Sequence, residues 1–195
     1  MKQNLLKRDL GDEKDILKMI ESRYWKEELS RIAKTLKPLR KPPRWSERAC
    51  CVVERDIMIG FFIIRRVIEL YKVSSRTRDF NMKVYSCPNQ GSKVTWMNNH
   101  RIFDHYDTEN EKSETKKPGY MSNQFIHAYT SFVFRNETRN WSEIYVVSDF
   151  DRNNRIWRVP IPVIQELFEL ASDDYPSWTK WRFDEKKGDF IVKTE

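Results

Sequence analysis

The sequence predicts an α+β protein with an N-terminal helical pair, one long central helix packed on an antiparallel sheet, a short later helix and a C-terminal hairpin. Apolar residues in the first 75 positions recur at helical intervals, whereas short apolar runs separated by turn residues follow from residue 82. Helices followed by antiparallel strands are typical of α+β folds. The chain has 195 residues, so we expect one domain with a helical part at 1–75 and a mainly β part at 76–195.

Two helices are expected before residue 75. In the first, Asp12 is the predicted N-cap, Pro38 ends the helix, and apolar residues recur at steps of about three and four: Ile16, Ile20, Leu29, Ile32 and Leu36. The second runs from Ser46 to about Val73 and confines its charges to a stripe of about a third of its circumference. Its remaining surface is apolar, so we expect it to be packed on several sides as the spine of the core.

The later part of the chain alternates short strands with turns. Strands are expected at 82–86, 93–97, 131–134, 143–148 and 155–159, with a turn at 87–91. Residues 107–119 are polar and predict a mobile surface loop, and residues 121–129 fit either a helix or a strand. A short helix at 163–171, with Pro162 in its first turn, and a hairpin with strands at 178–183 and 189–193 complete the prediction.

Composition excludes several classes of function. Five glycines and no glycine-rich loop argue against a nucleotide-cradling site, and three cysteines without paired spacing favour a reduced environment. No metal-ligand spacing occurs, so we expect neither a metal nor a cofactor. Asp149–Asn153 begins like a calcium loop, but Asn154 and Pro160 stand where Gly and Glu are needed. The apolar runs are too short for a signal peptide or a membrane span, so we expect a cytoplasmic protein without a membrane partner.

The positive charge lies in the N-terminal part. Residues 1–75 carry 18 Lys and Arg against 11 Asp and Glu, whereas residues 76–195 carry 18 of each. Basic residues near an aromatic ring suit a nucleic-acid backbone, so the predicted nucleic-acid-binding residues are Lys37, Arg40, Lys41, Arg44, Trp45, Arg76 and Arg78. The alternative is a charged connector between helices that its prolines stiffen.

All three histidines lie between residues 100 and 127. The last belongs to the segment Ser122-Asn123-Gln124-Phe125-Ile126-His127-Ala128-Tyr129. This segment resembles the motif of HEPN-domain proteins, a group of helical ribonucleases and RNA-associated proteins whose motif is Arg-Asn, three variable residues and His, often with a Tyr two further on. Residues 61–69 are also similar to the apolar, basic-edged helices of that family.

The resemblance implies metal-free chemistry on RNA. In the family, the Arg stabilises charge on the scissile phosphate and the His assists attack by the ribose 2′-hydroxyl. The resemblance therefore implies three candidate catalytic residues in this chain: Asn123, His127 and Tyr129. Ser122 stands in place of the Arg, which implies RNA binding without cleavage unless Arg65, Arg66 or Arg101 replaces the Arg in space. The alternative is that Asn123 and His127 are hydrogen-bonded core or helix-end residues.

Three functions follow as hypotheses. The first is an accessory or effector protein of a bacterial toxin or defence type that contacts RNA or DNA through its basic N-terminal part. The second is a non-enzymatic module that docks a protein partner or a second copy of itself through aromatics such as Trp141, Trp157, Trp178 and Trp181. The third is a metal-independent ribonuclease that uses His127.

Overall fold

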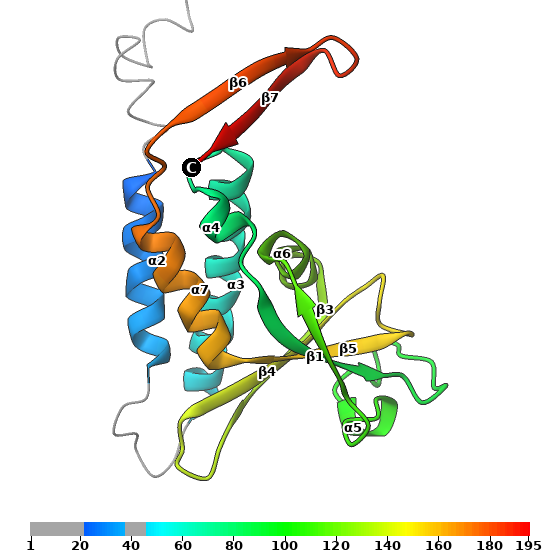
Figure 1. Cartoon of the computed structure of the whole chain (residues 1–195). Coiled ribbons are helices and arrows are strands. Elements are labelled where there is room, and N and C mark those ends of the chain that lie inside the picture. Colours follow the sequence, from blue (N-terminus) through cyan, green and yellow to red (C-terminus); the bar gives the residue numbers. More distant parts are fainter. Residues whose placement is uncertain (1–21, 38–45) are drawn as a thin grey trace, which may run out of the picture.

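The computed structural model describes residues 22–37 and 46–195. Its helices are α2 (Arg23–Leu36), α3 (Glu47–Glu69), α4 (Ser75–Arg78), α5 (Ile102–His105), α6 (Pro118–Ile126) and α7 (Ile161–Asp173). Its strands are β1 (Met82–Pro88), β2 (Lys112–Lys116), β3 (Ala128–Arg135), β4 (Trp141–Ser148), β5 (Arg155–Pro160), β6 (Thr179–Asp184) and β7 (Asp189–Thr194). The predicted α+β class is therefore confirmed, and Figure 1 shows helices α2, α7 and α3 gathered on one side of the sheet.

The main sheet has five strands in the order β2-β1-β5-β4-β3, and each neighbouring pair is antiparallel. In its centre Tyr85 lies opposite Arg158, which in turn lies opposite Tyr145. Alternate residues of a strand face opposite sides of the sheet. The β6–β7 hairpin forms a separate two-stranded sheet.

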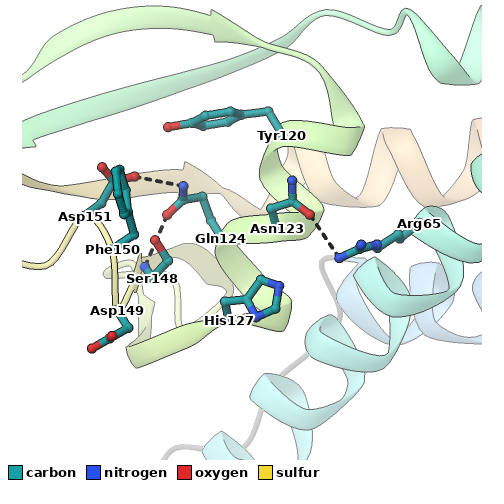
Figure 2. A pocket seen from close by; sticks show the side chains of 9 residues that line it. All are labelled: Arg65, Tyr120, Asn123, Gln124, His127, Ser148, Asp149, Phe150 and Asp151. Carbon is teal, nitrogen blue, oxygen red and sulfur yellow. Dashed lines mark hydrogen bonds between the residues drawn. The ribbon is translucent and has the colours of Figure 1, made fainter.

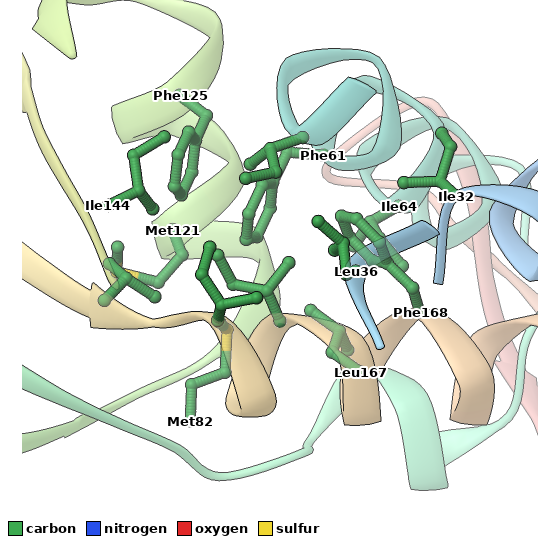
Figure 3. Packing of buried hydrophobic residues seen from close by; sticks show 14 of the residues in the cluster. Ile32, Leu36, Phe61, Ile64, Met82, Met121, Phe125, Ile144, Leu167 and Phe168 are labelled. Atoms are coloured by element: carbon green, nitrogen blue, oxygen red, sulfur yellow. The ribbon is translucent and has the colours of Figure 1, made fainter. Parts of the chain in front are cut away.

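The face of the sheet toward the helices carries the larger core. Phe61 of α3 stacks on Phe125 of α6, with ring centroids 4.0 Å apart, and meets Phe168 of α7 edge-on at 5.4 Å. Figure 3 shows these rings packed with aliphatic residues from the strands and from α2. Buried strand residues on this face are Met82, Val84, Ile144, Val146, Trp157 and Val159. The helices are thus fixed on the sheet by apolar burial, the dominant favourable contribution to folding.

The opposite face of the sheet is covered by the segment between β1 and β2. This segment places Val94, Ile102 and Tyr106 in a second apolar cluster with the outward residues Cys87, Tyr145, Val147 and Ile156. The hydroxyl of Tyr106 donates to the backbone oxygen of Arg152 at 2.6 Å. Because both faces are buried, β4 is buried at five consecutive residues, from Ile144 to Ser148.

The long helix begins where the sequence predicts. The hydroxyl of Ser46 caps α3 by accepting from the backbone nitrogen of Ala49 at 3.3 Å. The helix ends at Glu69 rather than near Val73, because Tyr71 takes a left-handed conformation with φ 54 and Lys72 donates its backbone N–H to the oxygen of Val67. On its sheet side, Glu54 accepts from the backbone nitrogen of Val133 in β3 at 3.2 Å.

The expectation that α3 is packed on several sides is confirmed, because α2, α6, α7 and β3 all contact it. The packing does not extend over its whole apolar surface, since four apolar residues are exposed to solvent: Val52, Ile59, Phe62 and Leu70. Phe62 still meets Trp25 of α2, with ring centroids 6.1 Å apart. Helix α2 confirms the first predicted helix from Arg23 to Leu36. Four residues named in that prediction lie outside the described residues: Asp12, Ile16, Ile20 and Pro38.

Two further predictions are wrong. Residues 93–97 do not form a strand, because Asn98 draws the backbone of Thr95 into a local hydrogen bond of 2.7 Å. Residues 93–95 have no regular structure, and residues 96–97 begin a turn. The loop expected at 107–119 contains β2, which pairs with β1 from Lys112 to Lys116 and leads into α6 at Pro118. Residues 121–129 divide between α6 and β3, so both readings of that segment hold in part.

The remaining strands and the later helix agree with prediction, and the strand expected at 82–86 lies within β1. The turn expected at 87–91 is wrong in its first two residues, because Cys87 and Pro88 belong to β1. Strands at 131–134, 143–148 and 155–159, the helix over 163–171 and the closing hairpin all form. The hairpin is attached at its base, where Thr194 donates to the backbone oxygen of Val73 at 2.7 Å and Ser75 donates to the Glu195 carboxylate at 2.5 Å. Among the described residues, no helix combines the length and apolar character needed to cross a bilayer.

Candidate functional site

An open cleft of about 690 Å³ lies where α3, α6 and the end of β4 meet. Arg65 contributes from α3, and Tyr120, Asn123, Gln124 and His127 contribute from α6 and its C-terminus. Ser148 and the turn residues 149–151 complete its lining (Figure 2). The cleft therefore contains two of the three candidate catalytic residues, Asn123 and His127.

Helix α6 presents these two side chains on one face. Asn123 and His127 are four residues apart, so both project from the same side of the helix. Met121, Ser122 and Phe125 are buried on its other side. His127 is the C-cap, and its backbone nitrogen donates to the oxygen of Asn123 at 3.1 Å.

Ser122, which stands at the position of the motif Arg, faces the core. Its exposed fraction is 0%, and its hydroxyl has no hydrogen-bond partner among the described residues. A guanidinium at this position would be a buried, unpaired charge, which is strongly unfavourable. An Arg for this cleft must therefore come from another element.

Arg65 supplies the guanidinium. Its Nη1 donates to the side-chain oxygen of Asn123 at 3.1 Å (Figure 2). Its Nε donates to Glu69 at 2.7 Å. The stack of Phe61 on Phe125 brings α3 against α6 one turn before Arg65, which explains the contact. Arg66 pairs with Glu69 at 3.4 Å and Arg101 caps α5, and neither lines the cleft.

The three histidines have different environments. The imidazole of His127 is exposed in the cleft and makes no hydrogen bond to any described residue. His105 is buried, with Nδ1 2.6 Å from the Ser92 hydroxyl and Nε2 3.1 Å from the backbone oxygen of Asn98. His100 is exposed outside the cleft. His127 is therefore the histidine that lines the cleft, and both of its ring nitrogens are free for a ligand.

Tyr129 does not line the cleft. Its ring in β3 is covered by the guanidinium of Arg152, at 4.4 Å from the ring centroid, and meets Trp96 edge-on at 5.9 Å. Arg152 also pairs with the cleft residue Asp149 at 2.5 Å. Tyr129 is thus linked to the cleft through Arg152, although the sequence motif placed it beside His127.

The wall opposite Arg65 is acidic and aromatic. Gln124 fixes this wall, because its amide donates to Asp151 at 2.9 Å and its oxygen accepts from the backbone nitrogen of Ser148 at 3.2 Å. Phe150, at the tip of the turn, is 88% exposed. Burial, together with the negative charge of Asp151, raises the pKa of Tyr120, so this phenol is a protonated hydroxyl at neutral pH.

The predicted basic residues are only partly described. Lys37 pairs with Glu169 at 2.7 Å, Arg78 lies 3.7 Å from Asp79, and Arg76 is exposed. Arg40, Lys41, Arg44 and Trp45 lie outside the described residues. Figure 1 shows α4 beside the C-terminal end of α3, whereas α2 ends toward the N-terminal end of α3. The described members of the set thus do not form one patch.

The tryptophans named for protein docking divide into two pairs. Trp141 and Trp157 are buried in the sheet, whereas Trp178 and Trp181 are exposed at the hairpin. In β6 and β7, Trp181 lies opposite Val192 and Phe183 opposite Phe190, so three aromatic rings share one face of the hairpin. Two of the four named residues are therefore available at the surface.

The described residues hold no cluster of three or more His, Cys, Asp or Glu side chains placed to bind a metal ion. Of the three cysteines, Cys50 is half-buried in α3 and Cys51 is exposed. Burial raises the pKa of the third, Cys87, to about 11, so it is an unreactive thiol. The chemistry available to the cleft is thus that of an imidazole, a guanidinium, amides, carboxylates and a phenol.

Comparison with models of known protein families, with curated proteins and with solved structures gives no match to this chain. Its function must therefore be argued from the geometry of the cleft.

Proposed function

We propose that the chain binds RNA in this cleft and cleaves it without a metal, with His127 as the acid–base group. The observation that carries the proposal is the hydrogen bond from Arg65 to Asn123, which sets a guanidinium beside the unpaired imidazole of His127. The resemblance of residues 122–129 to the HEPN motif supports the same chemistry, with Arg65 in place of the Arg that the motif lacks here.

The proposed reaction is transfer of a phosphodiester to the neighbouring 2′-oxygen. His127 takes the proton of the 2′-hydroxyl, the 2′-oxygen bonds to phosphorus, and the bond from phosphorus to the 5′-oxygen breaks. The leaving oxygen takes a proton from a cleft acid, for which the protonated phenol of Tyr120 is the candidate. The products are a 2′,3′-cyclic phosphate and a free 5′-hydroxyl.

Arg65 and Asn123 form the phosphate-binding side of the cleft. Arg65 retains guanidinium protons beyond those given to Glu69 and Asn123, and the Asn123 amide nitrogen has no partner among the described residues. Donors fixed before the reaction stabilise the charge that develops on the phosphate oxygens. The carboxylates lie on the opposite wall, where Arg152 pairs with Asp149 and Gln124 donates to Asp151, so their repulsion of the phosphate is reduced.

Cleavage of a single-stranded RNA in the presence of a chelator tests this proposal. Wild-type protein should cleave, and His127→Ala should lower the rate by about 100-fold or more, because a positioned acid–base group contributes about that much. His100→Ala is the matched control, since His100 is exposed outside the cleft, and should cleave as the wild type does. Cleavage that persists in His127→Ala, or a wild type without activity in chelator, would reject the ribonuclease proposal.

The accessory or effector role stays a second proposal, and the excess of basic residues in positions 1–75 favours it. For binding through phosphate contacts, the logarithm of the binding constant falls linearly with the logarithm of the salt concentration. Each phosphate contact contributes about one unit to the slope of that line. Filter binding with RNA and DNA at rising salt should therefore show a slope that falls when Arg76 is changed to Ala. Absence of binding even at low ionic strength would remove this role.

A further inference from the structure

Beside the cleft, residues 92–101 form a loop that holds a tryptophan in solvent. Trp96 is 74% exposed, and Met97 next to it is 84% exposed. Single exposed apolar residues are common on protein surfaces, but tryptophan is enriched at binding hot spots. The exposed ring of Trp96 is therefore a surface on which a ligand can stack.

The loop is held in place although it has no regular secondary structure. Val94 is buried, and its backbone nitrogen donates to the side-chain oxygen of Asn153 at 2.9 Å. Asn98 bonds the backbone of Thr95, and the buried ring of His105 contacts both Ser92 and Asn98. Trp96 thus projects from a fixed backbone, which lowers the entropic penalty of binding a ligand to it.

A series of side-chain contacts connects Trp96 to the cleft. Its ring meets Tyr129 at 5.9 Å, the guanidinium of Arg152 covers Tyr129 at 4.4 Å, and Arg152 pairs with Asp149 at 2.5 Å. Asp149 and its neighbour Phe150 line the cleft. A row of side chains in contact therefore leads from the cleft residue Asp149 to Trp96, through the basic Arg152 and the aromatic Tyr129.

The charge of the loop suits a polyanion. Residues 92–101 contain Lys93 and Arg101 and no Asp or Glu, and both basic side chains are exposed. Aromatic rings with basic groups around them are the usual surface for single strands, because bases stack on the rings while the cations follow the phosphates. Double-stranded RNA has its bases already stacked and offers none to an isolated ring.

We propose that Trp96 is a stacking platform for a base of single-stranded RNA, next to the nucleotide that occupies the cleft. This inference rests on the proposed function in that it takes RNA as the ligand of the cleft. It adds a second binding position, which requires an unpaired base outside the cleft. Cleavage itself is not required for stacking, so the two proposals fail separately.

Binding of a non-cleavable 2′-O-methyl RNA tests the platform. An RNA of about eight nucleotides is suitable, because this length is within the range that single-strand sites cover. Trp96→Ala should weaken binding by about 5- to 100-fold, which is the effect of removing one stacked base. Trp96→Phe should recover most of the affinity, because it restores a ring. Met97→Ala is the matched control, since Met97 is adjacent and more exposed, and should bind as the wild type does.

A dinucleotide separates the platform from the cleft. A dinucleotide is long enough to fill the cleft but not to reach Trp96. It should therefore bind Trp96→Ala and the wild type equally, whereas Arg65→Ala should weaken its binding. Equal affinity of Trp96→Ala and wild type for the longer RNA would overturn the platform, even if His127→Ala abolished cleavage. Failure of the wild type to bind either RNA would overturn both proposals, and loss of the ribonuclease proposal alone would leave the binding difference at Trp96 intact.

Discussion

Arg65 of α3 donates a hydrogen bond of 3.1 Å to the side-chain oxygen of Asn123 in α6, across 58 residues of sequence. The contact fixes a guanidinium on the face of α6 that also carries His127. It depends on the core beneath, where Phe61 and Phe125 stack and hold the two helices together. The polar geometry of the cleft thus depends on the apolar packing of α3 against α6.

Arg65→Ala should weaken binding of the 2′-O-methyl RNA by about 10- to 100-fold, because a hydrogen bond to a charged group contributes about 1.5–3 kcal/mol. Fluorescence anisotropy of a labelled RNA measures the change. Arg66→Ala is the control, since Arg66 shares the partner Glu69 but does not line the cleft. Equal losses in the two variants would mean that general positive charge, not the cleft, binds the RNA.

Gly60→Ala should destabilise the fold by about 1–3 kcal/mol, although alanine favours helix more than glycine does. A Cβ at position 60 would lie 2.3 Å from Cζ of Phe168, inside the packed core. Urea unfolding measures the loss. Gly119→Ala in α6 is the matched control, because a Cβ there meets no atom within 4 Å, and it should be neutral or stabilising. A Gly60→Ala variant as stable as the wild type would show that the helices are packed less closely.

Asp174→Asn should destabilise the protein by about 1–3 kcal/mol at neutral pH, and less in acid. Burial alone would raise the pKa of Asp174, but hydrogen bonds from Thr77 and Ser74 outweigh it and lower the pKa. A carboxylate with a lowered pKa stabilises the fold above its unfolded value of about 3.9, and this contribution is lost as pH falls through the lower folded value. The difference in unfolding free energy between Asp174→Asn and the wild type should therefore decrease when urea unfolding is repeated from pH 7 down to pH 3. A difference that stays constant with pH would contradict the assigned role.

Collisional quenching of tryptophan fluorescence should reveal two populations. Trp96, Trp178 and Trp181 are exposed and should be quenched readily by acrylamide, whereas Trp141 and Trp157 are buried and should resist. Trp181→Phe should remove part of the accessible emission only. Uniform protection of all indoles would mean that the hairpin and the 92–101 loop are covered in solution, and uniform quenching would contradict the buried sheet.

Much of the fold could be predicted from local patterns, because those patterns are sufficient for the elements concerned. Ser46 marks the start of α3, and short apolar runs between turn residues mark β4 and β5. The end of α3 could not be read, since the left-handed position that stops it is occupied by Tyr71 instead of glycine. The strand β2 was missed because it lies at the edge of the sheet with mostly exposed polar residues, which leaves no apolar alternation.

The candidate site was predicted only in part. The spacing of Asn123 and His127 places both on one helix face, a local property that sequence reveals. Arg65 is one of three arginines that the sequence offers as a replacement for the motif Arg, and its approach to Asn123 depends on how two distant helices pack. Tyr129 lies in β3, where its ring packs against Arg152 and Trp96 and does not line the cleft. No sequence signal identifies Trp96, because its exposure follows from the loop hydrogen bonds around it.

The most direct test is the NMR spectrum of the histidine rings during titration with the 2′-O-methyl RNA. The chain has three histidines, so three ring Cε1–H signals are expected, and each can be assigned by substitution. The account predicts that His127 shifts on binding, that the doubly hydrogen-bonded His105 stays still, and that the shift of His127 disappears in Arg65→Ala. An RNA that binds while the His127 signal does not move would contradict the assignment of the cleft as the site.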